Sequence, residues 1–172
     1  MKTTKLVFML LMAVCLQLNV VAQDTWDLAT LPKTDEDFKK SEQKFLTLLK
    51  WIEDTPMDKE TDKRTQVYAY LTAWEINSPT VTISVNSTFI DFHKKNSALL
   101  IYFMGGWSRY CLENNYSKDL VKSNLAGLRC ALGVYNKGIG FKQDKFMDKI
   151  KKMEDAGELE AWVTEEVSKQ KK

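Results

Sequence analysis

The sequence predicts an all-α fold, a single compact helical bundle of about five to six helices with a possible short extended segment at 80–85. Seven Gly and three Pro in 172 residues are too few for the frequent turns of an all-β sandwich. A hydrophobic content of 44% excludes a disordered chain. Apolar residues also recur at intervals of three and four, which is the spacing of helix faces.

The distribution of charge predicts one domain. Residues 67–136 carry only ten charged side chains, whereas the flanks 23–66 and 137–172 are rich in them. A charge-poor middle between charged ends is typical of central helices covered by outer amphipathic ones. We therefore expect a helical domain over 34–168, preceded by an extended stretch at 23–33 and followed by a frayed tail at 169–172.

Two amphipathic helices are expected first. Thr34 is a suitable N-cap for a helix that Pro56 ends, and acidic residues fill its first turn. A second helix should run from Asp62 to Asn77. The apolar residues on the inner faces of these two helices are Phe38, Phe45, Leu48, Leu49 and Ile52, and then Val67, Tyr70, Leu71 and Trp74.

The stretch from 80 to 95 is ambiguous. Val81, Ile83 and Val85 alternate with polar residues as in a strand, and Val, Ile and Thr favour extended structure. However, Ser78-Pro79 is also a good helix start. Because an isolated strand would leave backbone groups unpaired, we expect a helix over 86–95 and leave 80–85 open.

The central hairpin should be the most buried part of the fold. Residues 97–112 are apolar all round, as in a central helix, and Gly105-Gly106 interrupts them at a cost of about 1 kcal/mol each relative to Ala. Close approach of a neighbouring backbone, or a ligand, would explain that cost. Ser117 is then expected to cap a helix that runs from 118 to 136.

The last part of the chain predicts two shorter helices. Asp144 should begin a charged amphipathic helix that Gly157 ends. A final helix should carry Leu159, Trp162, Val163 and Val167.

Residues 1–22 resemble a secretory signal peptide. Lys2 and Lys5 precede an eleven-residue apolar stretch, and Val20-Val21-Ala22 fits a cleavage site. The apolar stretch is too short to span a membrane, so we expect no transmembrane span after cleavage. The features favour export to a bacterial periplasm or cell envelope, or secretion.

Removal of this segment leaves a neutral chain with two cysteines. Without Lys2 and Lys5 the 25 basic residues become 23, equal to the 23 acidic ones, which argues against nucleic-acid binding. Cys111 and Cys130 remain. A disulfide between them is possible in an oxidising compartment, but in a helical hairpin they should lie too far apart, so buried free thiols are the preferred interpretation.

Enzyme motifs are missing from the sequence. It contains one His and no HExxH, CxxC, GxSxG, P-loop or GxGxxG pattern. We therefore predict no metal, cofactor or catalytic set. His93 near Asp91 fits a surface pair better than an acid–base pair.

A candidate binding site is instead expected in the middle of the chain. Glu75 lies in a charge-poor stretch, and Arg109 is its expected salt-bridge partner. Gly105 and Gly106, which precede Trp107, lower the helix propensity of the same region, and this also indicates a site there. Central aromatic residues would form either core or the walls of a pocket. These aromatic residues are Tyr70, Trp74, Tyr102, Phe103, Trp107 and Tyr110.

Three functional hypotheses follow. The first is an exported, non-catalytic domain that binds a partner protein or a small apolar ligand. The alternative is a small periplasmic enzyme that uses Glu75 or Asp91 as general base. The third is an interaction module that acts through the outer helices at 143–168.

Overall fold

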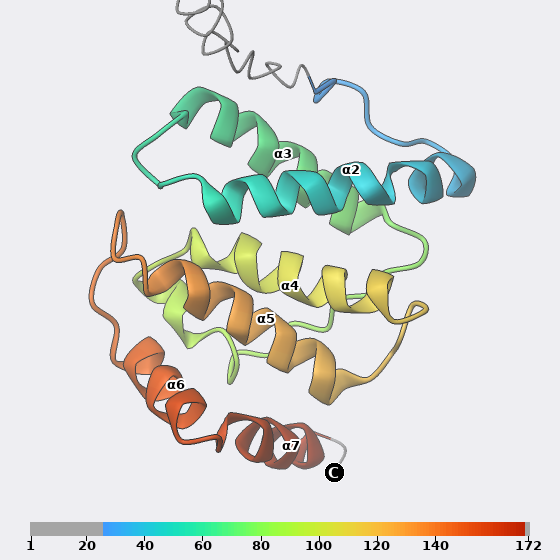
Figure 1. Cartoon of the computed structure of the whole chain (residues 1–172). Coiled ribbons are helices and arrows are strands. Elements are labelled where there is room, and N and C mark those ends of the chain that lie inside the picture. The colour runs from blue at the N-terminus through green and yellow to red at the C-terminus, as the bar shows by residue number, and fades with distance from the viewer. Residues whose placement is uncertain (1–25, 171–172) are drawn as a thin grey trace, which may run out of the picture.

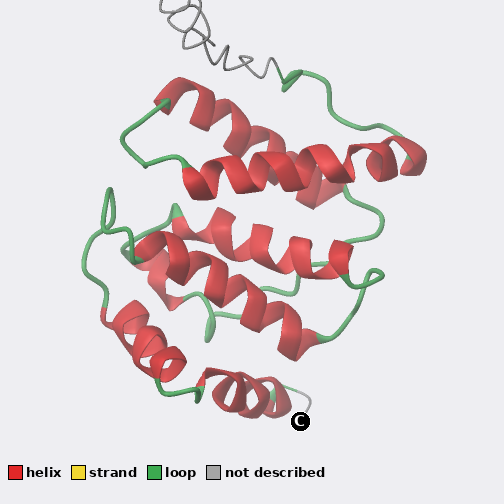
Figure 2. Ribbon diagram, viewed as in Figure 1, coloured by secondary structure: helices red, strands yellow, loops and turns green. Residues whose placement is uncertain are grey.

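The computed structural model describes residues 26–170, and over this range the all-α prediction is confirmed. Figure 2 shows helices joined by loops, with no strand among the described residues. The elements, in chain order, are α2 (Asp35–Asp54), α3 (Thr61–Asn77), the 3₁₀ turn η1 (Asp91–Lys94), α4 (Leu99–Glu113), α5 (Leu120–Tyr135), α6 (Lys145–Asp155) and α7 (Leu159–Lys169). The expected signal peptide, 1–22, lies outside the described residues.

The helices form three layers, which Figure 1 shows one above another. The α2–α3 pair packs on the α4–α5 hairpin, and α6 and α7 cover the far side of α5. The buried side chains form one core that includes α6 and α7, since Met147, Ile150, Leu159 and Val163 are fully buried. No described helix is long and apolar enough to cross a bilayer.

Two predicted helix starts are confirmed and one is wrong. Thr34 caps α2 in a capping box with Asp37, and Asp144 caps α6. The cap of α5 is Asp119, whose carboxylate accepts from two backbone N–H groups of the first turn, and not Ser117. Tyr116 has a positive φ angle of 56°, so the turn between α4 and α5 continues past it, and Ser117 lies two residues before the true cap.

The helix expected over 86–95 is also wrong. Only Asp91–Lys94 forms a short 3₁₀ turn, and 80–86 has no regular secondary structure. Asn86 explains the difference, because its side chain accepts from Thr88 N and its carbonyl from Phe89 N. This local turn competes with helix formation.

The Gly105-Gly106 pair allows α4 to pack closely, as predicted. A Cβ at Gly106 would lie 2.6 Å from the carbonyl oxygen of Ala126, and one at Gly127 would lie 2.7 Å from that of Phe103. The α4 and α5 backbones therefore touch at a crossing that glycine on both sides permits. Gly105 is covered from the opposite side by the side chain of Leu49.

A buried arginine ends α2. Helix α2 has no basic residue in its last turn. Arg64 of α3, which is only 4% exposed, donates instead to carbonyls at the C-terminal end of α2. These bonds reach Ile52 O at 3.3 Å, Thr55 O at 2.8 Å and Pro56 O at 2.8 Å. The guanidinium thus satisfies carbonyls that the helix itself leaves unpaired.

Candidate functional site

The structure does not gather the five predicted site residues into one place. Successive residues of a helix point about 100° apart, so Gly105 faces α2, Gly106 faces α5 and Trp107 is buried. Arg109 lies on the α2–α5 side of the helix. Glu75 meets α4 from α3, at Ser108.

Glu75 is a buried and incompletely paired carboxyl group. It is 5% exposed, and Ser108 Oγ donates to its Oε1 at 3.0 Å. Its other oxygen, Oε2, has no partner among the described residues. Burial raises the pKa of Glu75 from 4.5 to about 8, against the opposing effect of the hydrogen bond from Ser108. The predicted Glu75–Arg109 ion pair is wrong.

Arg109 pairs instead with Glu53 at the C-terminal end of α2. The Nη1–Oε2 distance is 2.7 Å, and the second oxygen of Glu53 accepts from the thiol of Cys130 at 2.8 Å. Burial raises the pKa of Cys130 well above its ordinary value, and the charge of Glu53 adds to the effect. Cys130 is therefore a protonated hydrogen-bond donor at neutral pH. Both Cys111 and Cys130 are free, as preferred from the sequence.

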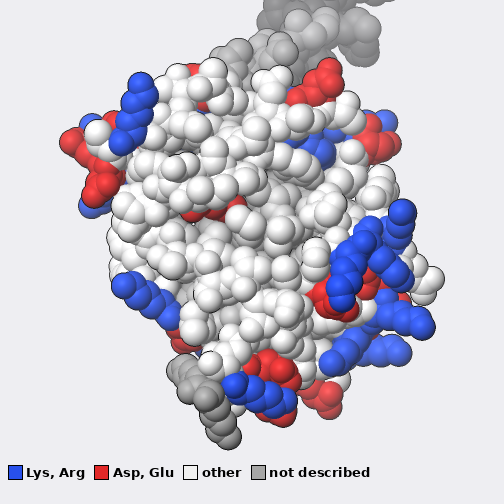
Figure 3. Space-filling model, turned by 180° about the vertical axis from the view of Figure 1, so that it is seen from behind, with Lys and Arg blue, Asp and Glu red and all other residues white. Residues whose placement is uncertain are grey.

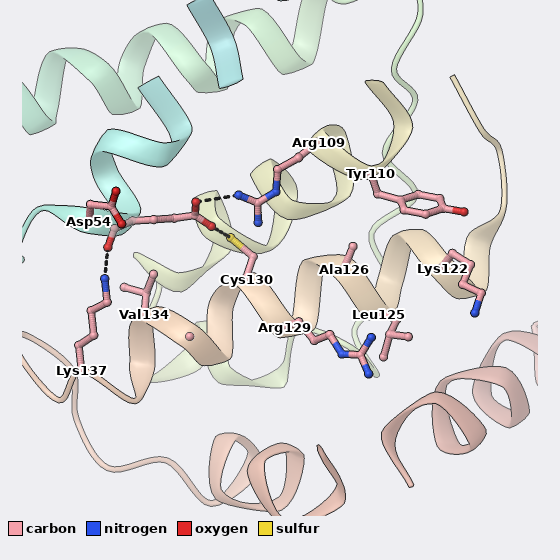
Figure 4. A pocket seen from close by; sticks show the side chains of 12 residues that line it. Asp54, Arg109, Tyr110, Lys122, Leu125, Ala126, Arg129, Cys130, Val134 and Lys137 are labelled. Carbon is pink, nitrogen blue, oxygen red and sulfur yellow. Dashed lines mark hydrogen bonds and ion pairs between the residues drawn. The ribbon is translucent and has the colours of Figure 1, made fainter. Parts of the chain in front are cut away.

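These three side chains line a hollow that we call the α5 groove. Figure 4 shows it running along α5, with α2 and α4 on one side and α6 and α7 on the other. Its volume is about 530 Å³. The lining residues are Glu53, Asp54, Arg109, Tyr110, Lys122, Leu125, Ala126, Arg129, Cys130, Gly133, Val134 and Lys137.

The floor of the α5 groove is apolar and open. Leu125, Ala126 and Val134 supply aliphatic surface from α5. At Gly133 a Cβ would meet no atom within 4 Å, so the helix backbone is bare there. Unlike Gly106, this glycine is not required by packing. A ligand would therefore meet an apolar surface and exposed backbone between polar walls.

The walls carry more positive than negative charge. Arg109, Lys122, Arg129 and Lys137 line the groove, against two acidic residues, Glu53 and Asp54. Neighbours outside the groove orient two of the cations: Arg129 binds Glu154 through two nitrogens, at 2.7 and 3.2 Å, and Lys122 binds Glu160. Lys137 donates to the carbonyl of Glu53. Held side chains lose less rotamer entropy when a ligand binds.

Sequence reasoning found Arg109 but not the α5 side of the groove. A signal was present, because Lys122, Ala126, Arg129, Gly133 and Lys137 follow at intervals of four and three along α5. They form one stripe of charged and small residues, turned by about 100° from the apolar seam that includes Val121, Leu125 and Leu128. What the sequence does not show is that α2 and α4 stand beside this stripe.

The other sequence candidates do not form a site. The aromatic residues expected around Glu75 belong to the core, apart from Tyr110, which lines the α5 groove. Asp91 is exposed and pairs with Lys94 at 2.6 Å, and that hydrogen bond lowers its pKa. Across the described range, no cluster of three or more His, Cys, Asp or Glu side chains could hold a metal ion.

Two smaller hollows lie elsewhere on the bundle. One, of about 230 Å³, lies between residues 80–84 and the adjacent ends of α4 and α5, and Trp107 lines it. The other, of about 310 Å³, lies between α3 and the start of α4. Glu75 lines neither of these, nor the α5 groove.

The chain was compared with protein-family models, with curated proteins and with solved structures. None of the three comparisons found a match.

Proposed function

We propose that this is an exported, non-catalytic protein of a bacterial periplasm or envelope that acts by binding, and that the α5 groove is its binding site. The ligand class is a small organic anion with an apolar body. The observation that carries this proposal is the combination, in one groove, of an apolar floor with walls that hold four cationic side chains. Export rests on residues 1–22 alone.

The size of the groove supports a small molecule as the ligand. About 530 Å³ lies within the range of roughly 300–1,000 Å³ that such sites occupy. Leu125, Ala126 and Val134 would cover the apolar body of the ligand. Arg109 and Arg129 would lie near its charged group, since a guanidinium suits carboxylate, sulfate or phosphate oxygens.

The chemistry of the groove supports binding over catalysis. Its thiol, Cys130, is kept protonated, and the half-buried carboxylate of Glu53 already accepts from Arg109 and from that thiol. A nucleophile needs a thiolate, and a general base needs a free lone pair near its substrate. These groups have structural partners instead.

A titration with an anionic apolar dye, 1-anilinonaphthalene-8-sulfonate, tests the site. We expect saturable fluorescence enhancement with the wild type, which Gly133→Phe abolishes by filling the floor. Gly133→Ala is the matched control, since it removes the same glycine and leaves the groove open. Neither variant should unfold the protein, because the site is open and glycine disfavours helix. Equal dye binding by all three proteins would refute the assignment.

The alternative proposal is a small enzyme with Glu75 as general base. One observation favours it, the pKa of about 8 together with the unpartnered Oε2. However, a base must reach its substrate, and Glu75 lines none of the three hollows described above. We rank this alternative below binding in the α5 groove.

The outer helices offer less support for a separate interaction module. The apolar residues of α6 and α7 are buried against the rest of the core. We therefore expect deletion of 143–168 to unfold the protein, since it would expose the covered face of α5.

A further inference from the structure

The chain between α3 and α4 contains a stretch without regular secondary structure and with unpaired backbone, residues 80–86, which we call the unpaired segment. Among the described residues, no backbone N–H or C=O of residues 82–85 has a hydrogen-bond partner. The pairing resumes only at its ends, where Ser78 Oγ accepts from Val81 N and Asn86 O accepts from Phe89 N. Water satisfies such groups in a monomer, and a second extended chain can replace that water.

The unpaired segment is buried at both ends and partly exposed between them, where Ile83 is half-buried against the core. Val81 and Phe89 are buried, at 4% and 0% exposure. Thr82 and Ser84 are exposed, and Val85 is 46% exposed. The 230 Å³ hollow separates this segment from the ends of α4 and α5. An anchored, extended and accessible chain is the form in which an edge strand recruits another strand.

The sequence of the unpaired segment is complementary to itself. When two copies run antiparallel with Ile83 opposite Ile83, Val81 lies opposite Val85 and Thr82 opposite Ser84. Because side chains alternate along a strand, one face of this pair is aliphatic and the other carries hydroxyl groups. Pairs of β-branched residues and Thr–Ser hydrogen bonds both stabilise antiparallel strands.

The surroundings of the segment also favour a second copy. Residues 76–90 contain no charged side chain, so the two paired segments themselves carry no like charges. In Figure 1 this part of the chain runs behind the helices. The opposite view, in Figure 3, shows a broad central area with few charged residues. Ile76, which is 72% exposed, adds apolar surface next to the segment.

We infer that the protein forms a twofold-symmetric dimer through antiparallel pairing of residues 80–86 from two copies, centred on Ile83. The pairing is local and adds few buried side chains, so the dimer is weak and reversible. Its position is independent of the α5 groove, because none of the groove residues belongs to the segment.

Charge pairs in the proposed register provide the sharpest test. In Thr82→Lys/Ser84→Lys both cross-strand pairs between positions 82 and 84 have like charges, whereas in Thr82→Lys/Ser84→Glu both of these pairs have opposite charges. Sedimentation over about 1 µM to 1 mM should show reversible dimers for the wild type and for the Lys/Glu variant. The Lys/Lys variant should stay monomeric. Both positions are exposed, so all variants should fold.

An equimolar mixture gives a second readout. Thr82→Glu/Ser84→Glu should also be monomeric alone, but it should form mixed dimers with the Lys/Lys variant. A wild type that stays monomeric over the whole range overturns the inference. So does a Lys/Lys variant that dimerises as tightly as the Lys/Glu variant.

A cysteine placed at the symmetry centre tests the register. Ile83→Cys should form a disulfide-linked dimer under mild oxidation, since directly opposite Cα atoms lie about 4.5–5.5 Å apart, within disulfide range. Val85→Cys is the control, because its own copy is four residues away in the partner strand. The native thiols are buried and should not interfere. Equal cross-linking of both variants overturns the register.

Discussion

Replacement of Glu75 by Gln should make the stability of this protein less dependent on pH. The carboxyl of Glu75 is buried between α3 and α4, with Ser108 as its hydrogen-bond partner. Gln has nearly the same shape, and its carbonyl oxygen can accept the hydrogen bond from Ser108. The substitution therefore removes the titrating proton and retains the packing.

The magnitude follows from the two pKa values. The pKa is about 8 in the folded protein and 4.5 in the ordinary, unfolded-like case. Below pH 4.5 the carboxyl group of Glu75 is protonated in both the folded and the unfolded protein, so folding does not bury a charge there. As the pH rises towards 8 the unfolded chain releases its proton first, so the folded state loses stability. At about 1.36 kcal/mol per pKa unit, this loss is roughly 2–3 kcal/mol between pH 5 and pH 7.

Urea unfolding of wild type and Glu75→Gln at pH 5, 6, 7 and 8 measures this effect. The difference in unfolding free energy between the two proteins isolates Glu75 from all other titrating groups. We expect the unfolding free energy of the variant, relative to that of the wild type, to rise steadily up to pH 8 and to stay constant above pH 8. A difference that stays constant across this range would refute the assignment of Glu75 as a buried acid of raised pKa.

Further substitutions test individual contacts by thermal or urea unfolding. Gly106→Ala should lose about 1–3 kcal/mol, because its Cβ would meet an α5 carbonyl, whereas Gly133→Ala should gain about 0.5–1 kcal/mol. Arg64→Met should lose about 3 kcal/mol, since it removes the guanidinium donor from the carbonyl of Ile52 and from those of Thr55 and Pro56 just after α2. Asp119→Ala should cost about 1 kcal/mol and Ser117→Ala less, because Asp119 caps α5. If Gly133→Ala were less stable than Gly106→Ala, or Ser117→Ala less stable than Asp119→Ala, the corresponding contact would be contradicted.

The parts of the fold that depend on local signals could be predicted from the sequence. Thr34 and Asp144 cap helices because a side-chain oxygen two or three residues before a free N–H has few alternatives. Gly106 indicated a close helix crossing because a glycine inside an apolar helix lets a neighbouring backbone approach. The prediction failed at 86–95, where the side chain of Asn86 forms a turn that competes with helix.

The candidate site depended on contacts between distant elements, so the sequence predicted little of it. Glu75 and Arg109 were the obvious ion pair in a charge-poor region, but Arg109 faces α2 and meets Glu53. Ser108, one residue earlier in α4, faces α3 and donates a hydrogen bond to Glu75. A rotation of about 100° per residue separates these two contacts. The apolar seam of α5 was visible in the sequence, whereas the groove beside it also depends on the positions of α2 and α4.

Native mass spectrometry of the protein purified from the cells that produce it tests the central claim, that the α5 groove binds a small ligand. We predict extra mass on each wild-type chain that disappears on denaturation, and a bare chain for Gly133→Phe purified in the same way. A bare wild-type protein, or the same extra mass on Gly133→Phe, would contradict the claim.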